Sequence, residues 1–346
     1  VDSHINELFP KAHFKKIKDK KPKKGEKLIN YSHSDTYYLL DKYKDGADCD
    51  RDRMMFTLQA LFNALVVIPS IDSGFIDKNN LILSADGSSL HIHSSPFGHK
   101  VLDGDDSDNI YRFSAPDADI GWDSDLESFY LGYTFYNISY HNPLKNIDLP
   151  VFASIENASR HDALSCISAA AQFLDMNHDL HPKYFCHDSA ADSLPVFQFF
   201  QHNNIIPVID HNPRRDSSKE YVEKNHTNND GIPVCMANRP MHFCGYDIQR
   251  CRKKYRCPLV MGDISSCPFV DQCSTSSYGR VSYINDGDSA RNAGPLSYKS
   301  ETWKKIYRNR TSTERINNRV LNHYHLHQMR IRNKDKHAFF TIFACI

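Results

Sequence analysis

Three acidic residues stand where they could bind divalent cations. Asp86 follows the apolar run 81–85, Asp188 follows the run 183–187, and Glu314 lies in a stretch with helical spacing. Mg²⁺ prefers carboxylate oxygens, and two such ions roughly 4 Å apart can activate a nucleophile and stabilise a leaving oxygen in phosphoryl transfer. Two aspartates at strand ends and a glutamate on a late helix therefore predict a carboxylate cluster for divalent metal.

The stretch 307–321 places further reactive groups beside Glu314. Tyr307 and Arg310 precede Glu314 by seven and four residues, so all three share one helical face at about 100° per residue. Arg310 could bind a phosphate bidentately and Tyr307 could stack on a base. An ordinary surface ion pair between Arg310 and Glu314, worth about 0.3–0.5 kcal/mol, is the alternative. The expected DNA contacts of this stretch are Tyr307, Arg310, Arg315 and Arg319.

Short motifs in a fixed order accompany the three acids, at 74–80, 86–87, 117–121, 132–133, 149–150, 157–162, 187–193 and 205–210. In this order the chain resembles the DDE-type transposases of bacterial insertion sequences, which have an RNase H-like catalytic core. The resemblance runs from about residue 74 to 215 and again from about 298 to 335. The chain departs from it at two places: Leu321 stands where a lysine is frequent, and Ala190 and Ala191 replace a Gly-Tyr pair.

The resemblance implies a transposase that cleaves the ends of its element and joins them to target DNA with two Mg²⁺ or Mn²⁺ ions. In such a site Asp86 bridges both ions, Asp188 binds one and Glu314 binds the other. The implied partners are element ends and target DNA, held by a homodimer on paired ends. Two alternatives stay open: an RNase H-like nuclease without strand transfer, and a catalytically inactive, transposase-derived DNA-binding protein.

The elements that would position the acids follow from local patterns. Residues 50–68 predict a helix capped by Asp50 and ended by Pro69, with an apolar stripe packed in the core. Residues 81–85 and 89–93 predict two strands joined by a hairpin turn at Gly87. His91 and His93 share one side of the second strand, where an exposed or hydrogen-bonded pair is favoured over metal ligands.

Strands are predicted at 129–140, 151–155, 184–187 and 205–209, and helices at 162–175 and 190–202. A three-strand meander followed by alternating helix and strand predicts an α/β fold with an RNase H-like mixed sheet flanked by helices. We expect four segments: an N-terminal basic and helical region (1–73), the first part of the core (74–215), a Cys-rich insertion (216–297), and the catalytic helix with the end of the core (298–346).

Six of the ten cysteines lie between residues 235 and 273. A small, loop-rich module needs a covalent or metal cross-link, and cytosolic proteins rarely use disulfides, so zinc is a candidate ligand. No tight Cys-x2-Cys pair occurs. Unlinked buried cysteines and disulfides therefore remain as alternatives. The candidate zinc ligands are Cys244, Cys251, Cys257, Cys267 and Cys273, with His226 or His242 in reserve.

Charge is balanced overall but unevenly distributed. The chain has 42 Lys plus Arg and 42 Asp plus Glu; lysines gather at 11–27, arginines and lysines at 301–336, and aspartates in an expected loop at 103–125. Segregated basic patches are compatible with a polyanionic partner. No run approaches the roughly 20 apolar residues of a membrane span. We therefore expect a cytoplasmic, nucleoid-associated protein without a membrane partner.

Overall fold

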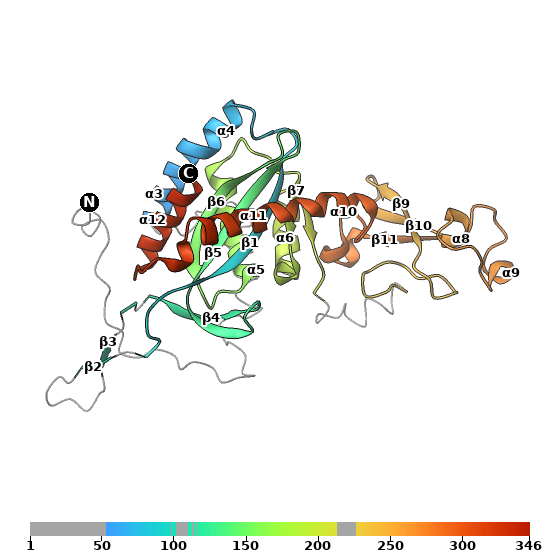
Figure 1. Cartoon of the computed structure of the whole chain (residues 1–346). Helices are drawn as coiled ribbons and strands as arrows, with labels where there is room; N and C mark the ends of the chain where they lie inside the picture. Colours follow the sequence, from blue (N-terminus) through green and yellow to red (C-terminus); the bar gives the residue numbers. More distant parts are fainter. Residues whose placement is uncertain (1–52, 98, 102–109, 113, 116, 213–225) are drawn as a thin grey trace. The chain divides into compact units, whose positions relative to one another are not determined.

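The computed structural model describes residues 53–97, 99–101, 110–112, 114–115, 117–212 and 226–346 (Figure 1). The chain divides into two compact units. Unit 1 comprises Val1–Lys183 and Asn309–Ile346, and unit 2 comprises Tyr184–Arg308. The expected division into four segments stays a prediction, and the Asp50 helix cap and the lysine-rich stretch 11–27 lie outside the described residues.

The centre of unit 1 is an antiparallel set of strands built around β5 (Ser128–Asn142). One edge of β5 pairs with β1 (Ile82–His91), and the other edge pairs first with β4 (Asp119–Asp123) and then with β6 (Ile147–Asn157). Aromatic and β-branched residues fill β5, and its long buried run forms the middle of the core. The predicted strands at 129–140 and 151–155 are confirmed, whereas β4 lies in the aspartate-rich stretch that was expected to be a loop.

Strand β1 passes straight through Gly87, so the predicted hairpin turn at that residue is wrong. Asp86 pairs with Asn137 and Gly87 with Tyr136 in an unbroken register. An added Cβ at this position would lie 2.7 Å from Oδ1 of Asp162, so the Asp162 side chain would have to shift for a larger residue to fit. Gly87, which suggested a turn, instead lies where the first residue of a helix, Asp162, approaches the strand closely.

Helices cover both faces of these strands. Successive strand residues point to opposite faces. Tyr136 points to α5 (Asp162–Met176), where its hydroxyl meets Cys166, and Asn137 points to α11 (Thr311–Asn318). Both α11 and α12 (Lys334–Cys345) pack on β6, and α12 also packs on α3 (Arg53–Phe62). The predicted helix 162–175 is thus confirmed, and it forms one of the two layers that enclose the sheet (Figure 1).

The first described helix does not end at Pro69 as predicted. An α-helix, α3 (Arg53–Phe62), continues through a π-helical turn (Asn63–Val67) into α4 (Ile68–Asp72). Proline is tolerated there because it occupies the first turn of α4. Leu58 is buried, but Leu61, Leu65 and Ile68 are exposed, so the predicted core stripe is only partly correct.

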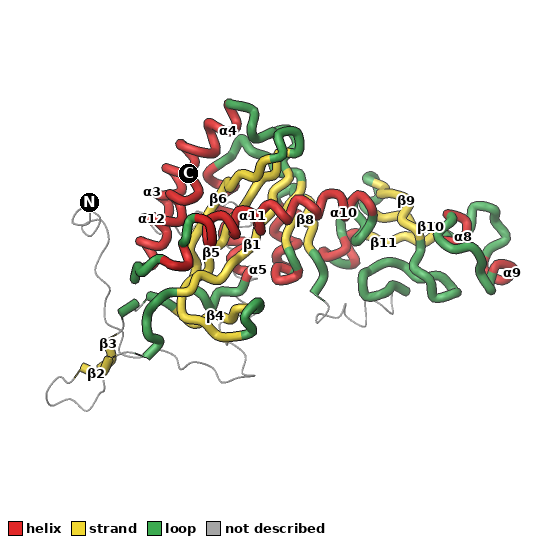
Figure 2. Tube along the Cα trace, in the orientation of Figure 1, coloured by secondary structure: helices red, strands yellow, loops and turns green. Residues whose placement is uncertain are grey.

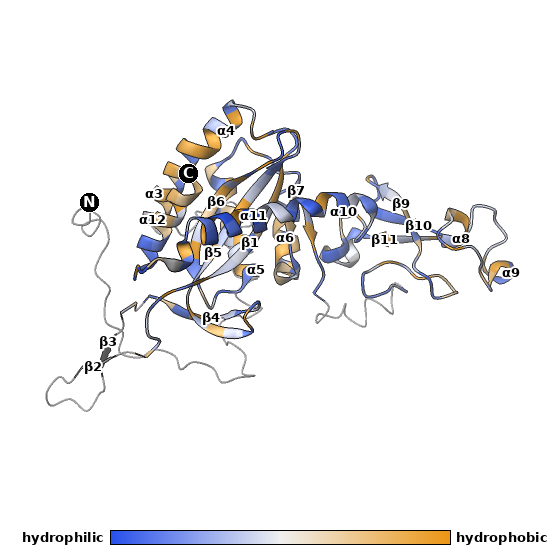
Figure 3. Cartoon of the chain, viewed as in Figure 1, coloured by the Kyte–Doolittle hydropathy of each residue, from blue (hydrophilic) through white to orange (hydrophobic). Residues whose placement is uncertain are grey.

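The same helix changes the expectation about membrane spans. Over Met55–Asp72 it is apolar (Figure 3) and long enough to cross a membrane, by length and composition only, and 28% of this window is buried. One such helix is weak support for a membrane span, because core helices of soluble proteins meet the same criterion. The prediction that no stretch approaches a span is nevertheless wrong at the level of composition.

Unit 2 begins with a parallel pair, β7 (Tyr184–His187) and β8 (Ile206–Ile209), connected through α6 (Leu194–His202). Helix α10 (Glu301–Tyr307) packs on both strands, and the Cys186 thiol donates to the Ile306 carbonyl at 3.5 Å. These strands and α6 confirm the predicted alternation of strand and helix, with Ser189–Ala191 forming a separate 3₁₀ turn. Antiparallel and parallel strand pairs beside helices confirm the mixed α/β class.

The rest of unit 2 contains a small sheet that the sequence did not predict. Strands β9 (His242–Asp247), β10 (Arg252–Arg256) and β11 (Val281–Asn285) pair antiparallel in the order β11-β10-β9 (Figure 2). Two short helices, α8 (Pro258–Met261) and α9 (Val270–Cys273), lie between β10 and β11. The core of the sheet is Met241, Tyr255 and Ile284.

Candidate functional site

A polar network in unit 1 connects β1 to the helix that carries Glu314. The Asn317 side-chain amide donates to Oδ2 of Asp86 at 3.1 Å and to Oγ of Ser88 at 2.7 Å. Its oxygen accepts from the fully buried amide of Asn137 on β5. One turn earlier, Ser312 and Ser139 hydrogen-bond at 2.6 Å. These contacts fix α11 over β1 and β5 and orient the Asp86 carboxylate.

Glu314 lies three residues before Asn317, so the two side chains are neighbours on α11. Oε1 of Glu314 accepts a hydrogen bond from Nη2 of Arg310 at 2.5 Å, and the Glu314 side chain is 49% exposed. The ion pair that was considered as an alternative is therefore present. The structure thus places Asp86 and Glu314 on elements of one unit that pack against each other.

Asp188 belongs to unit 2, at the end of β7. Its Oδ1 accepts from the Ala190 backbone N–H at 3.0 Å, which caps the 3₁₀ turn, and lies 2.9 Å from Nδ1 of the fully buried His187. A carboxylate can only accept, so this hydrogen bond requires the proton on Nδ1 of His187. The arrangement fixes the orientation of the Asp188 side chain, which remains 35% exposed.

Asp192, the second acid of the 187–193 motif, has a structural role instead. It is almost fully buried, forms an ion pair with Arg291 and accepts from the Asn212 backbone N–H at 2.7 Å. Beside it, Tyr298 donates to Asp210 and stacks on His211 at 3.6 Å. These contacts join the end of β8 to the segment before α10, and β8 is the parallel neighbour of the strand that Asp188 follows.

The four expected DNA contacts are in different environments. Tyr307 stacks on Trp303 at 4.5 Å in α10 of unit 2, and a 3₁₀ turn (Arg308–Arg310) separates it from α11. Stretch 307–321 is thus not the single regular helix that was predicted. Arg315 binds both carboxylate oxygens of Asp148 on β6, whereas Arg319 is exposed.

The ion pair between Arg315 and Asp148 changes the pKa of the carboxyl group. Burial by itself would raise the pKa of Asp148, but hydrogen bonds from Arg315 and then His141 outweigh it and lower that pKa.

Leu321 is buried in the π-helical turn after α11, so its side chain packs against the protein at the position where the resemblance leads one to expect a lysine.

Sequence reasoning missed Asn317, Asn137 and the Ser139–Ser312 pair. The available signal was a set of short polar side chains inside the apolar run of β5, where an unsatisfied amide or hydroxyl would be costly. His91 was correctly expected to be hydrogen-bonded: its Nε2 lies 2.8 Å from Asp123, and its ring stacks on Tyr130 at 4.6 Å. His93 is exposed.

Among the residues that the structure describes, neither unit holds three or more His, Cys, Asp or Glu side chains grouped closely enough to bind a metal ion. The carboxylates that could take part in a metal site are Asp86 and Glu314 in unit 1 and Asp188 in unit 2. Comparison with models of known protein families, with curated proteins and with solved structures found no significant match.

Proposed function

We propose that this protein is a DDE-type transposase that cleaves the ends of an insertion sequence and joins them to target DNA. The observation that supports it best is the hydrogen bond from Asn317 to Asp86. It ties an aspartate in the middle of β1 to the helix that carries Glu314, across 231 residues of sequence. A further support is the order of elements, with a three-strand meander before alternating helices and parallel strands. An RNase H-like core has this order.

The donor atoms fit the metal ions that this function requires. Carboxylate oxygens suit Mg²⁺ or Mn²⁺, and Asp86, Asp188 and Glu314 would hold them. Such ions stabilise the charge on attacking and leaving oxygens in phosphoryl transfer.

The chain's own residues have distinct tasks in this proposal. Asn317 holds one oxygen of Asp86 and His187 orients Asp188, so each carboxylate presents its remaining lone pairs in a fixed direction. Arg310 neutralises Glu314 and provides donors suited to a DNA phosphate. Arg319 adds an exposed positive charge on the same helical segment. Tyr307 stacks one face of its ring on Trp303, so that face is not available to stack on a base.

A basic and aromatic surface on β10 supports DNA binding by unit 2. Arg252, Lys254 and Arg256 alternate along the strand and therefore share one face. The guanidinium of Arg252 lies 3.8 Å over the Tyr283 ring, and that of Arg256 lies 3.5 Å over Tyr278. Positive charge interleaved with partly exposed aromatic rings is typical of surfaces that bind nucleic-acid backbones and bases.

The proposed function is tested by cleavage and joining of a supercoiled plasmid that carries the gene of this chain with its flanking genomic DNA. We expect Asp86→Asn, Asp188→Asn and Glu314→Gln each to lower Mg²⁺-dependent cleavage about 100-fold or more, because each removes a carboxylate from the charge-stabilising site. The matched controls are Asp179→Asn and Glu301→Gln, which change exposed acids and should cleave normally.

Three other outcomes would redirect or reject the proposal. Cleavage at the wild-type rate by Asp188→Asn would reject it. Cleaved products without joined target would instead identify a nuclease without strand transfer. Salt-sensitive DNA binding with no Mg²⁺-dependent product, in the wild-type protein, would identify an inactive DNA-binding protein.

A further inference from the structure

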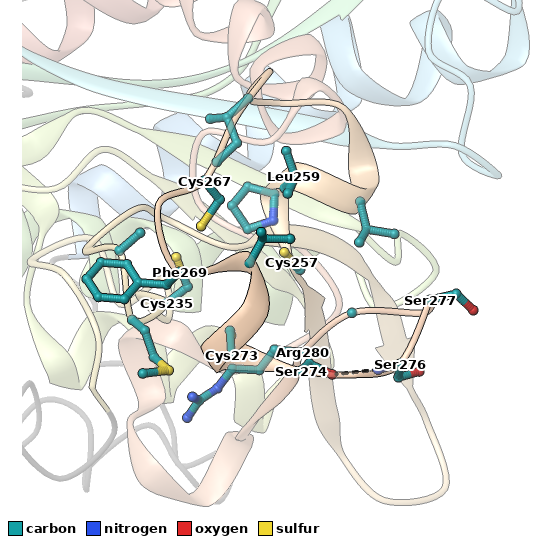
Figure 4. A pocket seen from close by; sticks show the side chains of 17 residues that line it. Cys235, Cys257, Leu259, Cys267, Phe269, Cys273, Ser274, Ser276, Ser277 and Arg280 are labelled. Atoms are coloured by element: carbon teal, nitrogen blue, oxygen red, sulfur yellow. Dashed lines mark hydrogen bonds between the residues drawn. The ribbon is translucent and has the colours of Figure 1, made fainter.

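Four of the cysteines in unit 2 line one cavity of about 220 Å³ (Figure 4). They are Cys235, Cys257, Cys267 and Cys273. All four thiols are free and partly buried. The other two cysteines of this region, Cys244 and Cys251, are exposed and lie outside the lining. This grouping differs from the five cysteines that the sequence spacing selected.

Two of the four thiols belong to the ordered part of the small sheet. Cys257 follows β10 directly, and its N–H donates to the Arg280 carbonyl at 2.9 Å. Cys235 packs against the core of Met241, Tyr255 and Ile284, in a turn where its N–H donates to the Arg239 carbonyl at 2.9 Å. These backbone bonds hold two sulfur ligands at fixed places on the sheet.

The other two thiols lie in the excursion between β10 and β11, residues 257–280. Cys267 follows α8, and Cys273 ends α9. In this excursion only Pro258 is fully buried, and Val260 and Val270 are exposed at 43% and 52%. A segment of this size with so little buried apolar surface needs a cross-link to hold one conformation. The hydrophobic effect alone does not account for its order.

We propose that Cys235, Cys257, Cys267 and Cys273 bind one structural Zn²⁺ ion that ties the excursion to the sheet. Thiolates favour Zn²⁺, and a closed tetrahedral Cys₄ set is its usual structural site. On binding, the four thiols release four protons to solvent, which leaves the site with a net charge of −2. Arg280 lines the same cavity and supplies compensating positive charge.

The proposal requires the sulfur atoms to move closer together. Among the described residues, no three thiols already surround a common point. Zn–S bonds of about 2.3 Å place tetrahedral sulfurs under 4 Å apart. Rotation about χ1 moves a cysteine sulfur between staggered positions without backbone change. The site does not depend on the proposed transposase function, because its role is to order the excursion.

The first test is the zinc content of the full-length chain, purified under reducing conditions without chelator. We expect one zinc per chain by mass spectrometry of the metal. Single Cys→Ser changes at each of the four positions should lower zinc to well below half. Cys244→Ser and Cys251→Ser are matched controls of the same chemistry outside the cavity, and both should retain one zinc. Full retention of zinc by Cys267→Ser would overturn the proposal.

A second test needs no variant, so it does not depend on how the variants fold. X-ray absorption at the zinc edge of the wild-type chain should show four sulfur neighbours at about 2.3 Å. Nitrogen or oxygen neighbours in place of two sulfurs would contradict the assignment. So would a zinc-free chain whose thiols all react freely with a thiol reagent, or a chain in which mass spectrometry finds these cysteines paired as disulfides.

Discussion

The sheet of unit 1 and the small sheet of unit 2 are held together by different means. In unit 1, β5 and β6 contribute long runs of buried residues, among them Phe135, Tyr136 and Phe152, and helices enclose them on both faces. In the described part of unit 2, strands β9–β11 share a core of three buried residues with three partly buried ones packed against it, and the excursion 257–280 buries little. Hydrophobic burial is therefore sufficient for the first sheet, whereas the second must draw on other interactions.

The buried polar groups also differ between the network around α11 in unit 1 and unit 2. Around α11 they are neutral amides and hydroxyls, which satisfy one another at modest cost. In unit 2 they include charged groups: Asp192 pairs with Arg291, and Lys253 is 3% exposed with its ammonium donating to the Asn292 carbonyl. Burial lowers the pKa of Lys253 to about 8, although Asp286 opposes that shift. A region that buries charge has less net stability to spare.

The largest expected effect tests whether the unit 1 core supports only its own unit. Phe135→Ala removes a fully buried ring from β5 and should destabilise unit 1 by about 3–5 kcal/mol. Hydrogen exchange should accelerate in β5 and β6 and stay nearly unchanged in β9–β11. Phe97→Ala, at a side chain that is 74% exposed, is the control and should change little. Equal acceleration in β9–β11 would show that the two regions unfold as one.

A smaller effect depends on pH. Burial lowers the pKa of His337 to about 4, so this side chain favours folding fully above pH 6.5, and that contribution is lost as the pH falls toward 4. At pH 5 the loss is about 2 kcal/mol, because one pKa unit corresponds to about 1.4 kcal/mol. Urea unfolding at pH 7.5 and pH 5 should show this loss.

His337→Gln, which cannot titrate in this range, should lose about 2 kcal/mol less than the wild-type chain between the two pH values. His93→Gln replaces an exposed histidine of unit 1 and should keep the wild-type dependence. If His337→Gln lost as much stability as the wild type, the buried histidine would not be the source of the acid sensitivity.

The smallest effect concerns the contact between α11 and the start of β6. Arg315 is 51% exposed and Asp148 17% exposed, so a double-mutant cycle with alanine at both positions should give a coupling of about 0.5–1 kcal/mol. Salt should weaken the coupling. A coupling above 2 kcal/mol would mean that the pair, and not the buried Asn–Ser network, holds α11 against the sheet.

Local patterns predicted the elements of the first core well. The aromatic and β-branched runs of β5 and β6, the helix predicted at 162–175, and the strands on either side of α6 each depend on neighbours within a few residues, and all were confirmed. Two predictions that took a single glycine or proline as the end of an element were wrong. Gly87 does not turn the chain, because β1 stays paired with β5 on both sides of it. Pro69 does not end the helix, because it lies in the first turn of α4, directly after the π-helical turn.

The sequence by itself determined the mixed α/β class and the main strands and helices of the first core, since these follow from residue chemistry and short-range periodicity. Only the tertiary structure decided that Asn317 holds Asp86, that Asp192 pairs with Arg291, and which four cysteines share a cavity. The residues in each of these contacts are separated by up to 231 positions. Their meeting depends on how helices pack on strands, and no local pattern encodes that geometry.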